Sequence, residues 1–222
     1  VIRYDGIHPD NIETNDFIDW ANSCNQTVPS LSGGTEPLFR FNGIFDTDEN
    51  IWDSATKIAV NFRAAFYYTG SKVRCAVYKN TIPVKMFSEG NIIQDSLSIN
   101  YMPMADRATE VEVTFLDSDN RFENTTISIL DKDINGSKAP ISVDAFGTTS
   151  LSQAWRFGKF VLANNKYVQT IINFQVDIDA LDCELGDVIS FQHNLPQWGF
   201  GGRLDGYYQS TDDLYINHFI ES

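Results

Sequence analysis

Carboxylates are the first side chains in this sequence that could do chemistry. Asp177 and Asp179 lie two residues apart near the end of a predicted strand, so their side chains would share one face, and Asp182 follows closely. Glycoside hydrolases use a pair of carboxylates across the scissile bond. The chain contains 30 Asp and Glu residues, so such a pair arises readily by chance. A hydrolase is therefore the least favoured hypothesis.

A second acidic group resembles the start of a calcium-binding loop and consists of Asp46, Asp48 and Asn50. An EF-hand loop needs Gly at its sixth position and Glu at its twelfth. This chain has Ile51 and Lys57 there. The same residue types are good helix N-caps, and their charge suits a helix start. We therefore predict that this group caps a helix and binds no metal.

Histidines and cysteines give no catalytic or metal-binding pattern. The three histidines are far apart in the sequence and lie in no ligand or triad spacing. They are His8, His193 and His218. The three cysteines are odd in number and form no CxxC pair, which argues against a disulfide framework and a zinc site. They are Cys24, Cys75 and Cys183. The glycine-rich stretch 199–202 opens no helix, so it predicts a turn and not a phosphate site. We predict no catalytic residue, no metal and no cofactor.

Tryptophans could stack on sugars, and one of them has a suitable context. Trp52 and Trp155 fall on apolar helix faces, so both are predicted to lie in a core. Trp198 lies between Pro196 and Gly199 in a predicted exposed loop. A contact surface made of Trp198, Tyr207 and Tyr208 gives the second hypothesis, a carbohydrate-binding β domain that recognises a glycan receptor.

Charge and composition exclude several functional classes. The 222 residues carry a formal charge of -14, which argues against sequence-independent nucleic-acid binding and against docking on anionic lipid. Sequence-specific nucleic-acid binding is not predicted either. Hydrophobic residues make up 42% of the chain, enough for a real core, but no stretch is apolar enough for stable membrane insertion. Because the sequence begins at Val1, we expect a fragment of a longer protein.

The first part of the chain predicts a leading segment and a small α+β unit. Residues 1–34 should be a lead-in segment and linker with a short helix around 17–21, and 28–34 should be a loop. Residues 35–82 should form a β-α-β-β domain. Its predicted elements are a strand at 38–45, a helix from 51 to about 64, and a hairpin of 65–68 with 73–78.

Residues 83–222 predict a second, mostly β domain. Alternating patterns predict strands at 96–101, 109–116, 125–130, 140–145, 168–178 and 188–192. One helix is expected at 150–164, opened by a capping box of Ser150 and Gln153. Leu151, Ala154, Trp155, Gly158, Val161 and Leu162 should form its apolar face. Gly158 costs helix stability, so it indicates a close approach to a strand. If 168–178 pairs with 97–101 and 109–116, the sheet closes into a barrel. The fold class is thus α+β and β-rich, with a β-α-β-β domain followed by a β-barrel-type domain that carries one packed helix.

The order of several short motifs resembles the tail-tip or baseplate hub proteins of bacteriophages, the lambda-like tip attachment protein J family. The motifs are 41–46 (FNGIFD), 83–84 (PV), 87–92 (FSEGNI), 107–115 (RATEVEVTF), 144–150 (DAFGTTS), 153–156 (QAWR), 174–181, 186–189 (GDVI) and 201–203 (GGR). Each motif is short, but their shared order over about residues 15–205 is fairly specific. The stretch 204–222 departs from the family pattern.

The resemblance implies the favoured hypothesis, a structural component without catalysis. Such proteins form homotrimeric rings at the distal end of the tail tube, where they contact the distal tail protein and the tape measure protein. They serve host attachment and DNA delivery. The chain would then be synthesised in the bacterial cytoplasm and end in the virion at the tail tip. A ring subunit needs strand edges and loops that pair with neighbours, not a catalytic pocket.

Overall fold

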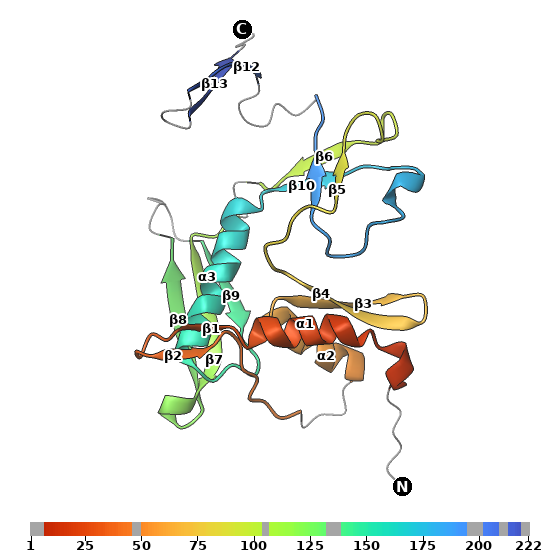
Figure 1. Ribbon diagram of the computed structural model, residues 1–222. Helices are drawn as coiled ribbons and strands as arrows, with labels where there is room; N and C mark the ends of the chain where they lie inside the picture. The colour runs from red at the N-terminus through yellow and green to blue at the C-terminus, as the bar shows by residue number, and fades with distance from the viewer. Residues whose placement is uncertain are drawn as a thin grey trace.

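The computed structural model describes residues 7–45, 50–103, 107–131 and 139–194, together with the backbone of 202–208 and 213–218. Within these residues the fold is mixed α+β, as predicted, with three α-helices and many short strands (Figure 1). The helices are α1 (Thr14–Cys24), α2 (Ile51–Asn61) and α3 (Leu151–Tyr167). They belong to two helix-on-sheet layers, and paired short strands lie beyond them.

The larger layer is built on a three-stranded sheet with β7 (Glu110–Asp117) in its centre. β8 (Glu123–Leu130) pairs with β7 in the antiparallel sense, and β9 (Pro140–Asp144) pairs with it in parallel. β7 is the clean alternating strand that the sequence predicts, and Val111 and Val113 on its inner face are fully buried. α3 packs on that face, and together they bury a core of Val111, Val113, Phe115, Ile129, Ala145, Ala154, Phe157 and Leu162.

The helix α3 approaches the sheet closely because of Gly158. A Cβ at this position would lie 2.3 Å from Ile129 Cδ1 and 2.6 Å from Val113 Cγ2, which confirms the predicted close approach. The predicted apolar face is partly wrong, because Leu151 and Trp155 are exposed. Phe157 is buried instead, so the buried stripe is rotated from the predicted one.

The predicted capping box is also wrong. Ser150 is the N-cap of α3, but its side chain makes no capping hydrogen bond. The Gln153 side chain is buried and serves another segment: it accepts from Arg40 N and donates to Arg40 O and to Thr148 Oγ1. These bonds explain a second error, since 38–45 is not a strand. Its backbone groups bond to a side chain and, through Asn42, to Gly147 O.

The smaller layer consists of the hairpin β3 (Ala64–Thr69) and β4 (Lys72–Val77) with two helices packed on it. The hairpin is confirmed as predicted, and Gly70 takes a positive φ of 61° in its turn. α2 begins at the N-cap Asn50, whose side chain accepts from Trp52 N, as the capping interpretation requires. Asp46 and Asp48 lie outside the described residues. α1 confirms the predicted short helix and extends it.

The detailed β-α-β-β layout is not confirmed, because the predicted strand 38–45 is not formed and the described strand that precedes α2, at Thr35–Pro37, is a shorter and earlier one. The segment 27–37 forms a small hairpin of β1 (Thr27–Pro29) and β2 (Thr35–Pro37), so the predicted loop shrinks to 30–34. A 3₁₀ helix (Pro9–Asn11) precedes α1. The predicted domain boundaries remain predictions.

Short paired strands make up the rest of the described fold. β5 (Lys85–Phe87) pairs in parallel with β11 (Ile189–Phe191), and β6 (Ser98–Tyr101) pairs antiparallel with β10 (Thr170–Asn173). β12 (Gly202–Tyr208) and β13 (Asp213–His218) form a hairpin near the C-terminus. The predicted strand 168–178 is thus only partly formed: β10 ends at Asn173, and a 3₁₀ helix (Ile178–Ala180) begins where the predicted strand should end. It reaches β6 but not β7, so the described residues form no closed barrel.

Candidate interaction surface

The structure does not bring the three predicted aspartates together on a strand face. Asp177 is the N-cap of the 3₁₀ helix at Ile178–Ala180, and Asp179 belongs to that helix. Asp182 lies beyond it with a side chain that is 88% exposed, and Lys85 Nζ is 3.5 Å from its Oδ2. The carboxylate-pair hypothesis required Asp177 and Asp179 to share one face of a strand. This requirement is not met, because the chain forms a 3₁₀ helix there.

The predicted aromatic contact surface cannot be placed. Trp198 lies outside the described residues, and Tyr207 and Tyr208 are described only as backbone at the end of β12. The two tryptophans predicted in the core are more exposed than expected. Trp155 is 40% exposed, with Lys159 Nζ 5.6 Å from its ring centre. Trp52 is half-buried and stacks on Tyr68 with a centroid distance of 4.7 Å.

Cysteines and histidines form no catalytic or metal-binding group in the described part of the chain. The three cysteines are free thiols, and burial raises the pKa of Cys75 to about 12. His8 is exposed, and His193 stacks on Phe191. No group of three or more His, Cys, Asp or Glu side chains among the described residues could hold a metal ion. None of the described helices has the length and hydropathy needed to cross a bilayer.

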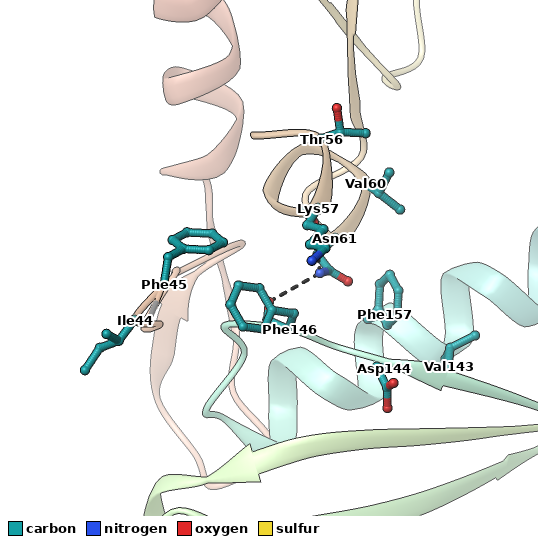
Figure 2. A pocket seen from close by; sticks show the side chains of 10 residues that line it. All are labelled: Ile44, Phe45, Thr56, Lys57, Val60, Asn61, Val143, Asp144, Phe146 and Phe157. Carbon is teal, nitrogen blue, oxygen red and sulfur yellow. Dashed lines mark hydrogen bonds between the residues drawn. The ribbon is translucent and has the colours of Figure 1, made fainter. Parts of the chain in front are cut away.

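Two apolar grooves are the most prominent surface features. The first, the Phe146 groove, is a cavity of about 740 Å³ between α2, β9 and the loops at 44–45 and 144–146 (Figure 2). Its walls include Ile44, 86% exposed, and Val60, 60% exposed, with Phe45 and Phe146 beside them. Exposed large apolar side chains that gather at a concave surface are typical of a protein contact.

Buried polar and aromatic contacts hold the Phe146 groove in shape. Asn61 is 7% exposed, and its Nδ2 donates to Phe146 O over 3.3 Å, the bond drawn in Figure 2. Phe41 lies against Gly147, which has a φ of 75°, and a Cβ there would be 2.2 Å from the Phe41 ring. The loop that presents Phe146 is therefore fixed from both sides.

The second groove, the Arg63 groove, has a volume of about 930 Å³ and meets the first at Val60. It lies between the end of α2, the start of β3, β9 and the second half of α3. Apolar side chains dominate its wall, and Tyr78 and Val168 are 64% and 60% exposed. Ile141 of β9 and Phe160 of α3 are half-buried in it.

A guanidinium lies in the wall of this groove. Arg63 follows the C-cap of α2 and has a φ of 56°. Its Cζ is 4.2 Å from the centre of the Phe160 ring and 5.5 Å from that of Phe39. Burial lowers the pKa of Arg63, and the charge of Arg156 lowers it further. Its Nε is buried without a hydrogen-bond partner, and no described carboxylate forms an ion pair with it.

Among the described residues, the sheet edge beside the grooves has no partner strand. β9 pairs with β7 on one side, and no described strand pairs with its other side. Ile141 and Val143 of β9 line the two grooves, one in each. β8 forms the opposite edge of the same sheet. An unpaired strand edge is a site where another chain can add a strand.

Sequence reasoning missed both grooves. Helix periodicity assigns a residue to a face of its own helix, but Val60 and Phe146 meet only through the tertiary fold. Arg63 carried a usable signal: it is a single cation between Phe62 and Ala64 in an otherwise apolar run. The stem of such a side chain can lie along apolar surface, and burial of its charged head costs free energy unless the charge is compensated.

Comparison with known proteins places the chain among phage tail proteins. The profile of a family described as "Putative phage tail protein" matches residues 52–205. The tip attachment protein J of Escherichia phage SECphi27 is 25% identical over 195 residues, which are 87% of this chain and 16% of that protein. The chain thus spans about a sixth of this curated relative. A chain from the virion of a native gene transfer agent particle shares the fold, with a TM-score of 0.54 and 13% identity. That likeness covers 72% of this chain and 36% of the other.

Proposed function

Because the chain belongs to the family of putative phage tail proteins, we propose that it is part of the tail-tip hub, at the distal end of the tail tube. It is a structural tail protein of the virion. The observation that carries the finer assignment is the similarity to a tip attachment protein J over 87% of the chain. Its role there is to build the ring through which the tail attaches to the host and delivers DNA, and no catalysis is involved.

The surface of the described residues supports an assembly role. Two apolar grooves meet at Val60, and an open strand edge, β9, runs beside them. In a ring each subunit covers such features of its neighbour, so they need no protection of their own. Three copies around the tail axis would contact the distal tail protein and the tape measure protein. The acidic charge of -14 suits a passage in which DNA slides without binding.

The proposed division of labour follows the predicted domains. Residues 35–82 act as the small hub domain, 83–222 as the second one, and 1–34 as the lead-in. The curated relative is about six times longer than the matched segment. We therefore assign no receptor recognition to this chain, and Trp198, Tyr207 and Tyr208 remain a predicted contact surface.

Immunogold electron microscopy tests the assignment directly. Antibodies raised against this chain are applied to particles of the phage that encodes it, and the expected gold label lies at the distal end of the tail. The same serum adsorbed with the purified chain is the control. Label at the head, at the head–tail junction, or only on unassembled protein would overturn the proposal.

A further inference from the structure

The Arg63 groove contains a positive charge without a described counter-charge, and this indicates what kind of segment could bind there. It is an apolar groove with one partly buried guanidinium, and no described carboxylate pairs with Arg63. A partly buried cation is stabilised most by a carboxylate brought to it, since the attraction grows as water is excluded. The complementary occupant is therefore a segment with both exposed apolar side chains and an exposed carboxylate.

The chain itself presents such a segment at 178–185. Ile178, Leu181 and Leu185 are 71%, 78% and 61% exposed, although large aliphatic residues are usually inside. Successive three-residue turns run through the segment: Leu181 N donates to Ile178 O, and Cys183 N donates to Ala180 O.

This 3₁₀-type geometry sorts the side chains of the segment into two ridges. Side chains three residues apart eclipse one another in a 3₁₀ helix. Ile178 and Leu181 therefore form an apolar ridge, and Asp179 and Asp182 form an acidic ridge beside it. We call this segment the 178–185 knob. Asp182 is 88% exposed, and its 3.5 Å contact with Lys85 is a surface ion pair of small value.

We propose that the 178–185 knob of one copy docks into the Arg63 groove of a second copy of this chain. The apolar ridge lies against Val60, Tyr78 and Val168, and the Asp182 carboxylate pairs with the Arg63 guanidinium. This proposal rests on the proposed function, because it supplies the contact between ring subunits.

Symmetry gives the contact a direction. Groove and knob are different surfaces, so the contact is heterologous, and repetition leads to a closed ring or to a filament. The knob is small compared with a standard interface, so isolated chains associate weakly. The net charge of -14 on each copy opposes contact at low salt. The experiment therefore uses physiological ionic strength.

A charge-swap experiment tests the pairing by sedimentation velocity of the full chain over a range of concentrations. The wild type is expected to associate. Arg63→Glu and Asp182→Arg should each lower the association constant at least tenfold. The double variant Arg63→Glu/Asp182→Arg should recover most of it, because the pair is restored with reversed charges. Single variants that associate like the wild type, or a double variant without recovery, overturn the inference.

A second pair of variants keeps the test valid if Arg63→Glu fails to fold. Leu181→Ser removes the most exposed apolar side chain of the knob and should weaken association. Leu31→Ser is the matched control, since Leu31 is also exposed, at 55%, in the turn between β1 and β2. Equal effects of the two variants contradict the inference.

The two proposals can fail separately. A chain that stays monomeric at every concentration, while immunogold marks the tail tip, overturns the docking inference and leaves the proposed function standing. If the chain associates as expected but no gold label lies at the tail tip, the proposed function is overturned and the docking inference stands.

Discussion

The two helix-on-sheet layers use the same architecture but complete it to different degrees. α3 on β8-β7-β9 buries eight hydrophobic residues in one continuous cluster. Where α1 and α2 pack on β3-β4, the buried cluster holds only Ala59, Ala64 and Cys75. Val73 of β4 is buried outside this cluster, and the large aromatic side chains packed against the cluster are only half-buried. The first layer is closed on its helix side, whereas the second opens into the two grooves at Val60.

This difference indicates that the larger layer contributes most of the buried core, whereas the smaller layer exposes more apolar surface. A three-stranded sheet under a 17-residue helix can bury a full core, while a two-stranded hairpin under two 11-residue helices cannot. The smaller layer therefore depends more on aromatic contacts and ion pairs. Its apolar surplus remains exposed at the surface of the described residues.

Equivalent deletions in the two layers should give the largest contrast. Phe115→Ala removes a side chain that is 3% exposed, and it should lower the free energy of unfolding by about 3–5 kcal/mol. Phe66→Ala removes a half-buried ring from β3 and should cost about half as much, because less apolar surface leaves water there. Chemical denaturation measures both, and equal losses would break the comparison.

The closeness of α3 to its sheet gives the next largest effect. Gly158→Ala should destabilise the protein by about 1–3 kcal/mol, because the new Cβ would overlap Ile129 and Val113. Alanine alone would favour the helix by about 1 kcal/mol. Gly90→Ala is the control, since its Cβ would find nothing closer than Ser88 Oγ at 3.8 Å. A stabilised Gly158→Ala variant would show that the layer is looser than described.

The smaller layer should depend on pH through Asp16. The Arg74 guanidinium donates to the Asp16 carboxylate over 2.8 and 3.3 Å, which ties α1 to β4 and holds the pKa of Asp16 below its ordinary value of 3.8. A lowered folded pKa stabilises the fold above the unfolded pKa, and this contribution is lost as pH falls through the folded pKa.

Asp16→Asn should therefore lower the free energy of unfolding at pH 7 by about 1 kcal/mol, and the difference from wild type should shrink as the pH falls below about 4 and vanish only below the lowered pKa of the folded state. Urea titrations at several pH values measure this difference. Asp182→Asn, at a side chain that is 88% exposed, is the control, and it should change the free energy of unfolding at pH 7 by less than about 0.5 kcal/mol. A pH-independent difference for Asp16→Asn would mean that the ion pair does not hold the layer.

The smallest effect is expected in the groove itself. Val60→Ala changes a side chain that is 60% exposed on α2, so the free energy of unfolding should stay within about 0.5 kcal/mol of wild type. Thermal melts of both proteins check this. A larger loss would show that the groove residues already belong to a core, which would remove the contrast between the layers.

Local patterns predicted the elements whose neighbours are close in sequence. The hairpin β3-β4, the alternating strand β7 and the helix α3 were all found in the sequence, and Gly158 indicated its own close approach. Alternation in 38–45 was misleading, because Gln153 satisfies the backbone there from more than 100 residues away. The prediction of a continuous strand at 168–178 was wrong for a related reason, since only the first part of this segment has a partner strand, β6.

The interaction surface could not be predicted from the sequence in the same way. Val60, Phe146 and Ile141 come from three separate elements, and each looks locally like an ordinary core residue. Their exposure results from the incomplete smaller layer, which no local pattern records. The family resemblance predicted surfaces that contact neighbouring subunits, which stays a prediction, and it indicated no position for them.

The contacts between 31–40 and α3 also constrain the order of folding during synthesis. Leu31 N donates to Ser152 Oγ, Leu38 O accepts from Arg156, and Gln153 binds the Arg40 backbone, all across 113 to 121 residues. At a translation rate of about 5–20 residues per second, the early segment waits on the order of ten seconds for its partner helix to leave the ribosome. Meanwhile Phe39, which is 7% exposed in the folded chain, stays accessible to chaperones and to other nascent chains.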